Sequence, residues 1–334
     1  MASVDTTSSQ DIKDTMTIDH RTNRSIPTFI LQHLIKPFNT RLIQPKKGLP
    51  GGSNQLEVHR KAKKRCDVQE RVVEGIYIYD MLPKHQLAQN GSARKKKRKR
   101  LYYFAGGAWR MPPSTEHWAL CVEFVKQLPD TTVSIVSYPL APNSPAPKAI
   151  PHLMEMYKCI MQDAQGVGED VIFVGDSAGG NVILCLTSAA LAEDEKAPCP
   201  TTLMAISPAC DLSNQNPEMA TTEKHDPLLR TWFTGESATK WRDSWDAEDP
   251  RVTPLAADVS ALVRRGVRVH GIVGSYDILS PDAVLFRDKC KAAGVRGEWL
   301  HWEKQMHCFA LAWMYRLPES VAAKDWIVDV LRRS

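Results

Sequence analysis

The chain has 334 residues, of which 43% are hydrophobic and 24% are charged, and its formal net charge at pH 7 is +5. This length and apolar content predict one domain with a large core and a small cap. Much of the positive charge lies in one run, residues 94–100, so the net charge does not identify a partner. The eight cysteines are scattered without a C-x-x-C pair, which excludes a recognisable metal site or disulfide framework and favours a reducing compartment.

The N-terminal segment is polar and lacks the basic start, apolar stretch and small-residue cleavage site of a secretory signal. Residues 1–20 are rich in Ser, Thr and Asp and have little apolar surface to offset the entropy lost on ordering, so they are predicted to be disordered. No stretch reaches the roughly 18 apolar residues that a membrane-spanning helix needs. We therefore expect a cytoplasmic protein without a transmembrane segment.

Residues 21–70 are predicted to form N-terminal cap helices. From Ser25 onward, apolar residues recur at steps of three and four, as on one face of a helix. They are Ile26, Phe29, Ile30, Leu34, Ile35 and Phe38. Such a face must cover something apolar. The alternatives are packing against the core, capping of an active site and contact with a membrane interface.

Strands alternate with helices from residue 71 onward, which predicts one α/β domain over residues 71–334. The predicted strands are 71–79, 102–105, 132–138, 171–175, 203–207, 267–274 and 298–302, and the predicted helices are 149–163, 181–191, 281–293 and 319–332. This alternation indicates a mainly parallel sheet with helices on both faces. Polar and Trp-bearing pieces interrupt it over about residues 212–249, where a cap insertion is predicted.

The motif G-x-S-x-G occurs at residues 175–179, directly after an apolar strand and before a helix. In that setting the turn is so sharp that bulky neighbours would collide, and the glycines let Ser177 project its hydroxyl at the N-terminus of the helix. The helix dipole favours negative charge developing there. Ser177 is therefore the candidate nucleophile.

The partners of this serine are expected at the ends of later strands, the acid before the histidine. One predicted strand ends shortly before Asp277, and the loop after the next predicted strand carries His307. Asp277 would orient the imidazole of His307, which would take the Ser177 proton and return it to the leaving alcohol. His301 lies inside the strand pattern and Asp282 opens a helix, so they are the weaker candidates for base and acid.

Acyl transfer also needs backbone N–H groups aimed at the tetrahedral oxyanion. Ala178, directly after the serine, is predicted to supply one of them. The Gly-Gly loop after strand 102–105 is predicted to supply the others from Gly106, Gly107 and Ala108, of which the last two are the best placed. A plain Gly-Gly turn without this role is the alternative.

Several segments between about residues 100 and 310 resemble the hormone-sensitive-lipase-like branch of the α/β hydrolases. Residues 104–109 are similar to its H-G-G-G-W loop, 138–142 to Y-R-L-A-P and 175–181 to G-D-S-A-G-G-N, and residues 207–212, 249–255 and 277–279 also look like family landmarks. The resemblance implies an α/β-hydrolase fold, with a mainly parallel eight-stranded sheet, helices on both faces and a helical cap. It also implies a serine carboxylesterase that works without a cofactor or metal.

The expected substrate is an apolar small-molecule ester, such as an acetyl ester or lactone of a secondary metabolite or sterol, because fungal steryl-acetate deacetylases and esterases of secondary metabolism look similar in these segments. The alternatives are an acyltransferase or lactone-forming cyclase with the same triad, and a non-catalytic binding protein. The chain departs from the family at Ala105 and Ala108, where the family has His and Gly, and at Cys308, where Gly is usual. Cys308 either crowds the acyl pocket or packs beside it.

The run at residues 94–100 is predicted to be a solvated loop between two strands, with a nuclear-import signal or an anion-binding patch as alternatives. No interleaved aromatic pattern supports binding of nucleic acid. Trp109, Trp232, Trp241 and Trp245 either line an apolar pocket under the cap or pack in the core. The resemblance leaves a homodimer open.

Overall fold

The computed structural model describes residues 15–44, 49–84 and 98–334, and one sheet runs through its centre. The strand order in this sheet is β1-β9-β8-β7-β6-β4-β5-β3-β2, and six of the eight pairings are parallel. The strands are β1 (Met16–Arg21), β2 (Cys66–Val73), β3 (Ile76–Pro83), β4 (Lys99–Phe104), β5 (Thr131–Ser137), β6 (Asp170–Asp176), β7 (Thr202–Ile206), β8 (Arg268–Tyr276) and β9 (Gly297–Met306).

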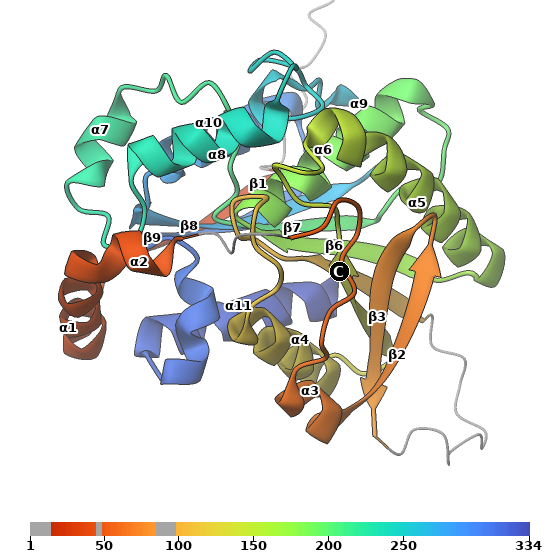
Figure 1. Cartoon of the computed structure of the whole chain (residues 1–334), viewed down its shortest axis with the longest axis horizontal. Coiled ribbons are helices and arrows are strands. Elements are labelled where there is room, and N and C mark those ends of the chain that lie inside the picture. The colour runs from red at the N-terminus through yellow and green to blue at the C-terminus, as the bar shows by residue number, and fades with distance from the viewer. Residues whose placement is uncertain (1–14, 45–48, 85–97) are drawn as a thin grey trace, which may run out of the picture.

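Helices cover both faces of the sheet (Figure 1). One apolar cluster joins α5, α6, α8 and α10 to one face, and a second joins α3, α4 and α11 to the other. The helices, with 3-10 turns marked η, are α1 (Ile26–Ile35), η1 (Lys36–Phe38), α2 (Asn39–Leu42), α3 (Arg60–Arg65), α4 (Thr115–Gln127), α5 (Ala146–Val167), α6 (Ala178–Glu193), α7 (Glu218–Glu223), α8 (Thr231–Arg242), η3 (Pro254–Ala256), α9 (Ser260–Arg264), α10 (Ser280–Ala293), η4 (Phe309–Tyr315) and α11 (Pro318–Arg333). The predicted α/β-hydrolase fold, with a mainly parallel sheet between two helical layers, is confirmed.

The parallel arrangement decides where the functional side chains lie. Strand β6 is covered on both faces, which is why its sequence is a continuous apolar run. Strands β6, β8 and β9 run in the same direction, so their carboxyl ends meet at one edge of the sheet. Ser177, Asp277 and His307 each follow directly after one of these strands.

The sheet has nine strands in the described residues, so the prediction of eight is wrong. The additional strand is β1, which pairs in parallel with β9 from Met16 opposite Gly297 to Arg21 opposite Trp302. The predicted disorder of residues 1–20 is therefore wrong for residues 16–20, while residues 1–14 lie outside the described residues. Only Met16 of this edge strand is buried, so main-chain pairing orders a segment whose composition gives little sign of it.

The prediction of one strand at residues 71–79 is also wrong, because the chain forms a hairpin there. Strands β2 and β3 pair antiparallel across a two-residue turn at Glu74 and Gly75, both with positive φ, as in a type I′ turn. The sheet thus begins at Cys66, inside the range predicted as cap helices. Cys66 is the one buried residue of β2 and the rest are exposed or half-buried, so the apolar signal of this strand is weak.

The structure describes the predicted cap insertion fully and the basic run only in part. The predicted cap insertion at about residues 212–249 contains α7 and α8. The basic run at residues 94–100 was predicted to be a loop, but Lys99 and Arg100 begin β4. Arg100 is ion-paired with Glu169, with 2.9 Å between Nε and Oε2. Residues 94–97 lie outside the described residues.

Candidate active site

Ser177 occupies a strained turn between β6 and α6. Its backbone has φ 53° and ψ −120°, a left-handed conformation that is costly for a residue other than glycine. The turn is tight enough that a Cβ on Gly179 would lie 1.9 Å from the carbonyl oxygen of Phe104. Glycine is therefore required there, and the turn presents the serine hydroxyl at the N-terminus of α6.

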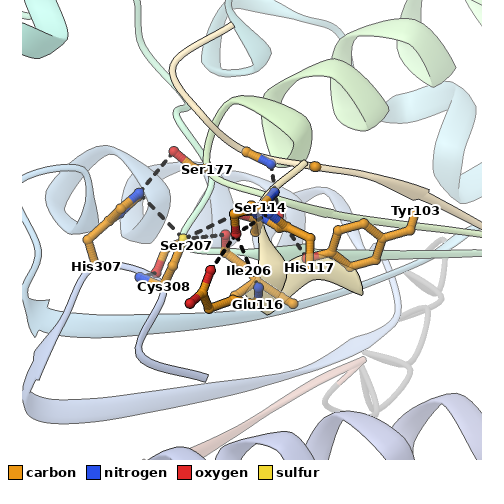
Figure 2. A network of polar contacts seen from close by, with 12 residues as sticks. Tyr103, Ser114, Glu116, His117, Ser177, Ile206, Ser207, His307 and Cys308 are labelled. Carbon is orange, nitrogen blue, oxygen red and sulfur yellow. Dashed lines mark hydrogen bonds and ion pairs between the residues drawn. The ribbon is translucent and has the colours of Figure 1, made fainter. Parts of the chain in front are cut away.

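A hydrogen-bonded relay connects this hydroxyl to a buried carboxylate. Ser177 Oγ lies 2.9 Å from His307 Nε2, and His307 Nδ1 lies 2.8 Å from Asp277 Oδ2 (Figure 2 shows the serine and the histidine). Burial opposes protonation of the imidazole, but the Asp277 carboxylate prevails and raises the pKa of His307 well above its ordinary value. Asp277 has no exposed surface, and its Oδ1 accepts the Leu279 N–H at 2.9 Å, which fixes its orientation.

The weaker candidates for base and acid lie elsewhere. His301 is within β9, and its ring packs at 5.1 Å against the ring of His20. Asp282 is in the first turn of α10, and its Oδ1 accepts a hydrogen bond of 2.6 Å from Asn216 Nδ2. Neither side chain takes part in the relay.

The loop after β4 places the predicted oxyanion donors beside the serine, with one correction. The Gly106 N–H donates to Asp176 Oδ1 at 2.9 Å, so it does not point at a reacting carbonyl. The N–H groups of Gly107, Ala108 and Ala178 donate to no acceptor in the described part of the chain. Three of the four predicted donors therefore remain candidates, because the N–H of Gly106 supports the loop instead.

That support is a buried polar network that the sequence analysis missed. Besides Gly106, Asp176 accepts hydrogen bonds from the Tyr103 hydroxyl at 2.7 Å and from His117 Nε2 at 3.2 Å. The Ser114 N–H donates to His117 Nδ1 at 2.8 Å, which leaves the proton on Nε2 for Asp176. Although burial opposes ionisation, His117, Gly106 and Tyr103 together hold the pKa of Asp176 below its ordinary value.

One signal in the sequence pointed to this network without revealing its partners. Asp176 is the first of the two variable residues of the G-x-S-x-G motif, so its place beside the candidate nucleophile was known. Its partner His117 comes from α4 on another segment of the chain (Figure 2). There is no room for a Cβ at Gly106, because it would lie 2.3 Å from Asp176 Oδ2. The loop and the carboxylate are therefore in direct contact.

A cavity of about 30 Å³ opens above Ser177, between the loop after β4 and α8. Its walls are mostly apolar, from Trp109, Leu229, Phe233 and Leu279 among others, with Asp211 as the one acidic residue in the lining. Trp241 lies behind Trp109, with the two rings stacked at 5.9 Å. Of the tryptophans considered for the pocket, only Trp109 lines this cavity.

Comparison with known proteins assigns the fold to a family. Residues 101–311, more than half of the chain, match the family described as alpha/beta hydrolase fold. The chain belongs to this family. An esterase of Acinetobacter venetianus is 31% identical over 198 residues, which cover 59% of this chain and 62% of that esterase, so the chain spans less than two thirds of that relative's length.

Two further proteins connect this hydrolase to the predicted branch. A hormone-sensitive lipase of Ictidomys tridecemlineatus is 27% identical over 195 residues, which cover 58% of this chain and 24% of the lipase. A solved hormone-sensitive lipase from a metagenome library superposes with a TM-score of 0.72 at 21% identity, covering 93% of this chain and 99% of that one, which shows a shared fold. The predicted resemblance is confirmed, and the predicted class, a hydrolase of carboxylic esters, is the class that the names of these relatives state.

Cys308 stands where the resemblance led us to expect glycine. The residue has φ 49°. Its thiol packs between the relay and the Asp176 network, 3.4 Å from His307 Nε2 and 3.7 Å from Asp176 Oδ2. Burial raises the pKa of this thiol to about 12, so it stays protonated. Cys308 is not among the residues that line the cavity.

The cap insertion of the hydrolase also touches the relay. Asp226, which follows α7, accepts the Ile278 N–H at 3.0 Å, directly after Asp277 in the chain. Burial and the neighbouring Asp277 raise the pKa of Asp226 to about 6. The sequence alone gave no sign of this contact, since the two residues are far apart in the chain.

No group of three or more His, Cys, Asp or Glu side chains in residues 15–44, 49–84 and 98–334 is arranged to hold a metal ion. Within the same ranges, no helix combines the length and apolar character needed to cross a bilayer.

Proposed function

We propose that this chain hydrolyses a carboxylic ester of a small molecule, through an acyl-enzyme on Ser177. The observation that carries the proposal is the continuous relay from Ser177 through His307 to Asp277, which begins on a strained turn at the base of an apolar cavity. A serine hydroxyl is a weak nucleophile unless a base takes its proton as it attacks. The relay supplies such a base within hydrogen-bonding distance.

In the proposed mechanism, Ser177 attacks the ester carbonyl while His307 accepts its proton and Asp277 stabilises the imidazolium. The oxyanion forms at the N-terminus of α6, where Ala178 and the loop residues Gly107 and Ala108 present N–H groups. His307 then protonates the leaving alcohol, and the acyl group stays on Ser177. Water activated by His307 releases the acid and restores the serine.

The cavity supports an apolar acyl or alcohol group of modest size. The cavity volume is small, about 30 Å³, and the lining offers one carboxylate, Asp211. The Ser213 N–H and hydroxyl both donate to Asp211 at 2.7 Å, so this carboxylate is engaged within the protein. We therefore place short acyl esters, acetyl esters among them, ahead of long-chain lipids as substrates.

The test uses p-nitrophenyl esters from acetate to octanoate and a fluorophosphonate label, applied to the parent chain and to Ser177→Ala. We expect the parent to turn over the short esters fastest and to take the label, and Ser177→Ala to do neither. Labelling without turnover would favour acyl transfer to another acceptor. A folded parent chain that does not take the label would contradict the proposal.

The pH dependence of kcat/KM is a second expected result. Protonated His307 cannot accept the serine proton, and Asp277 raises the pKa of this imidazole above its ordinary value of 6.5. Activity should therefore be present above that raised pKa and be lost as the pH falls through it, so the acidic limb lies above pH 6.5. A profile of kcat/KM between acidic and mildly alkaline pH checks this. An acidic limb below that value would mean that Asp277 does not act on His307.

A further inference from the structure

The amphipathic helix near the N-terminus presents most of its apolar face to solvent. Helix α1 and η1 form where the apolar periodicity predicts a helix, and Leu31 and Ile35 are half-buried against the core, but the other large apolar side chains are exposed. The exposed set consists of Ile26, Phe29, Ile30, Leu34 and Phe38, whose exposed fractions range from 43% to 75%. In the helix their spacing puts the first four on one side. Of the three alternatives for this face, packing of these five side chains against the core is therefore wrong.

Polar contacts on the opposite side fix this orientation. Thr28 and Gln32 are the buried residues of α1. The buried carboxylate of Glu319, in the first turn of α11, accepts hydrogen bonds from the Ser25 N–H and hydroxyl and from the Thr28 hydroxyl. Gln32 Nε2 donates to the Lys304 carbonyl at 2.9 Å. Because these bonds are satisfied only in this orientation, the helix is anchored by its polar side and presents its apolar side outward.

The charged residues of the segment that contains this apolar face are all basic. Between residues 21 and 44 the chain has four Arg or Lys residues and no Asp or Glu. Lys36 Nζ donates to the Lys224 carbonyl at 2.6 Å, and the Arg24 guanidinium lies 4.7 Å from the centre of the Phe29 ring. Lys224 and Lys304 add exposed cations from neighbouring segments.

The nearest acids on the adjoining strands β1 and β9 are already paired. Asp19 bonds to Arg21, with 2.7 Å between Oδ2 and Nη2, and Glu303 lies 3.6 Å from His20 Nε2. Glu223 at the end of α7 accepts the hydrogen bonds of Thr231. Within the described residues, the surface around α1 is therefore apolar in the middle and carries more cations than acids at its margin.

The helix lies at the edge of the sheet where the relay is found. Its bonds reach Lys304 near the end of β9, and Arg24 lies over the ring of Tyr276 at the end of β8. In Figure 1, α1 and α2 stand beyond the ends of β8 and β9. A surface that contacts the apolar face of α1 would approach the same edge of the sheet as Ser177.

We propose that α1 and η1 bind the surface of an anionic membrane, with the apolar face at the boundary between headgroups and acyl chains. A helix with large apolar residues on one side and cations at its margin lies in such an interface without spanning it. The charge pattern favours this occupant over a second copy of the chain, since an isologous dimer through α1 would bring like charges together. The proposal concerns binding alone and does not rest on the proposed ester hydrolysis.

The test is co-sedimentation of the full chain with phosphatidylcholine vesicles, with and without phosphatidylserine. The test variant is Phe29→Gln/Ile30→Gln, because glutamine keeps helix propensity while removing apolar surface. The matched control is Val167→Gln, which changes an apolar residue, 71% exposed, at the end of α5. We expect the parent and Val167→Gln to bind vesicles that contain phosphatidylserine, and to bind them more weakly at high salt. The double variant should bind these vesicles at least about tenfold more weakly than the parent.

Two results would overturn the membrane proposal. One is a parent chain that stays in solution with anionic vesicles. The other is a double variant that still binds vesicles but changes from dimer to monomer in solution, which would make the apolar face an interface between copies. Hydrolysis of p-nitrophenyl acetate by the double variant should equal that of the parent, so failure of membrane binding and failure of catalysis are separately visible.

Discussion

Asp277→Asn is expected to lower kcat for ester hydrolysis by about 10⁴-fold while the chain stays folded. Both carboxylate oxygens of Asp277 accept hydrogen bonds, one from His307 Nδ1 and one from the Leu279 N–H. An asparagine has only one acceptor oxygen, so its amide group would face a donor at one of these positions. The imidazole would then favour the tautomer with its proton on Nε2, which cannot accept the Ser177 proton.

The measurement is kcat on p-nitrophenyl acetate together with the rate of fluorophosphonate labelling, for folded proteins of comparable Tm. Asp282→Asn is the matched control, because Asp282 is also a buried aspartate near the same strand but bonds to Asn216. The control should keep most of the parent activity. A kcat of Asp277→Asn close to that of the control would remove Asp277 from the mechanism.

His117→Ala is expected to lower the free energy of unfolding by about 3–5 kcal/mol, because it leaves the Asp176 carboxylate buried without one of its partners. It should also lower kcat by about 10²-fold, with a smaller change in KM, since the oxyanion donors act mainly in the transition state. The reason is the bond from the Gly106 N–H to Asp176, which connects the carboxylate to the loop that carries Gly107 and Ala108. Urea denaturation and steady-state kinetics measure the two effects.

His117→Gln separates the positioning role from simple loss of packing. A glutamine amide can donate to Asp176 and accept from the Ser114 N–H, as His117 does. We expect this variant to recover most of the stability and kcat. If His117→Ala itself matched the parent in both, the network would have no part in placing the loop.

The fold could be predicted from the sequence where the signal is local. A buried parallel strand needs apolar residues on both faces, so β6 is visible as an uninterrupted run, and its helix α6 follows at once. An edge strand such as β1 needs little burial, because its stability comes from main-chain bonds to β9. No side-chain pattern announces a strand of that kind.

At the candidate site, too, local sequence signals predicted some features and long-range contacts decided others. The glycines around Ser177 are dictated by the close approach of backbone atoms, so the motif predicted the position of the nucleophile. The order of strands then limited the candidates for the other two positions to a few residues. Whether Gly106 uses its N–H for an oxyanion or for Asp176 depends on a carboxylate 70 positions away in the chain. Which acceptor the Gly106 N–H binds is therefore decided by how the loop packs against β6.

By itself, the sequence determined the α/β architecture, the position of Ser177 and the choice of Asp277 and His307 as its partners, because these depend on local periodicity, glycine sterics and strand order. Only the tertiary structure decided the ninth strand, the Asp176 and His117 network and the direction in which α1 faces. Helical periodicity defines an apolar side but does not say where the core lies. For α1, that was decided by the buried carboxylate of Glu319, which binds Ser25 and Thr28 from 294 and 291 positions away.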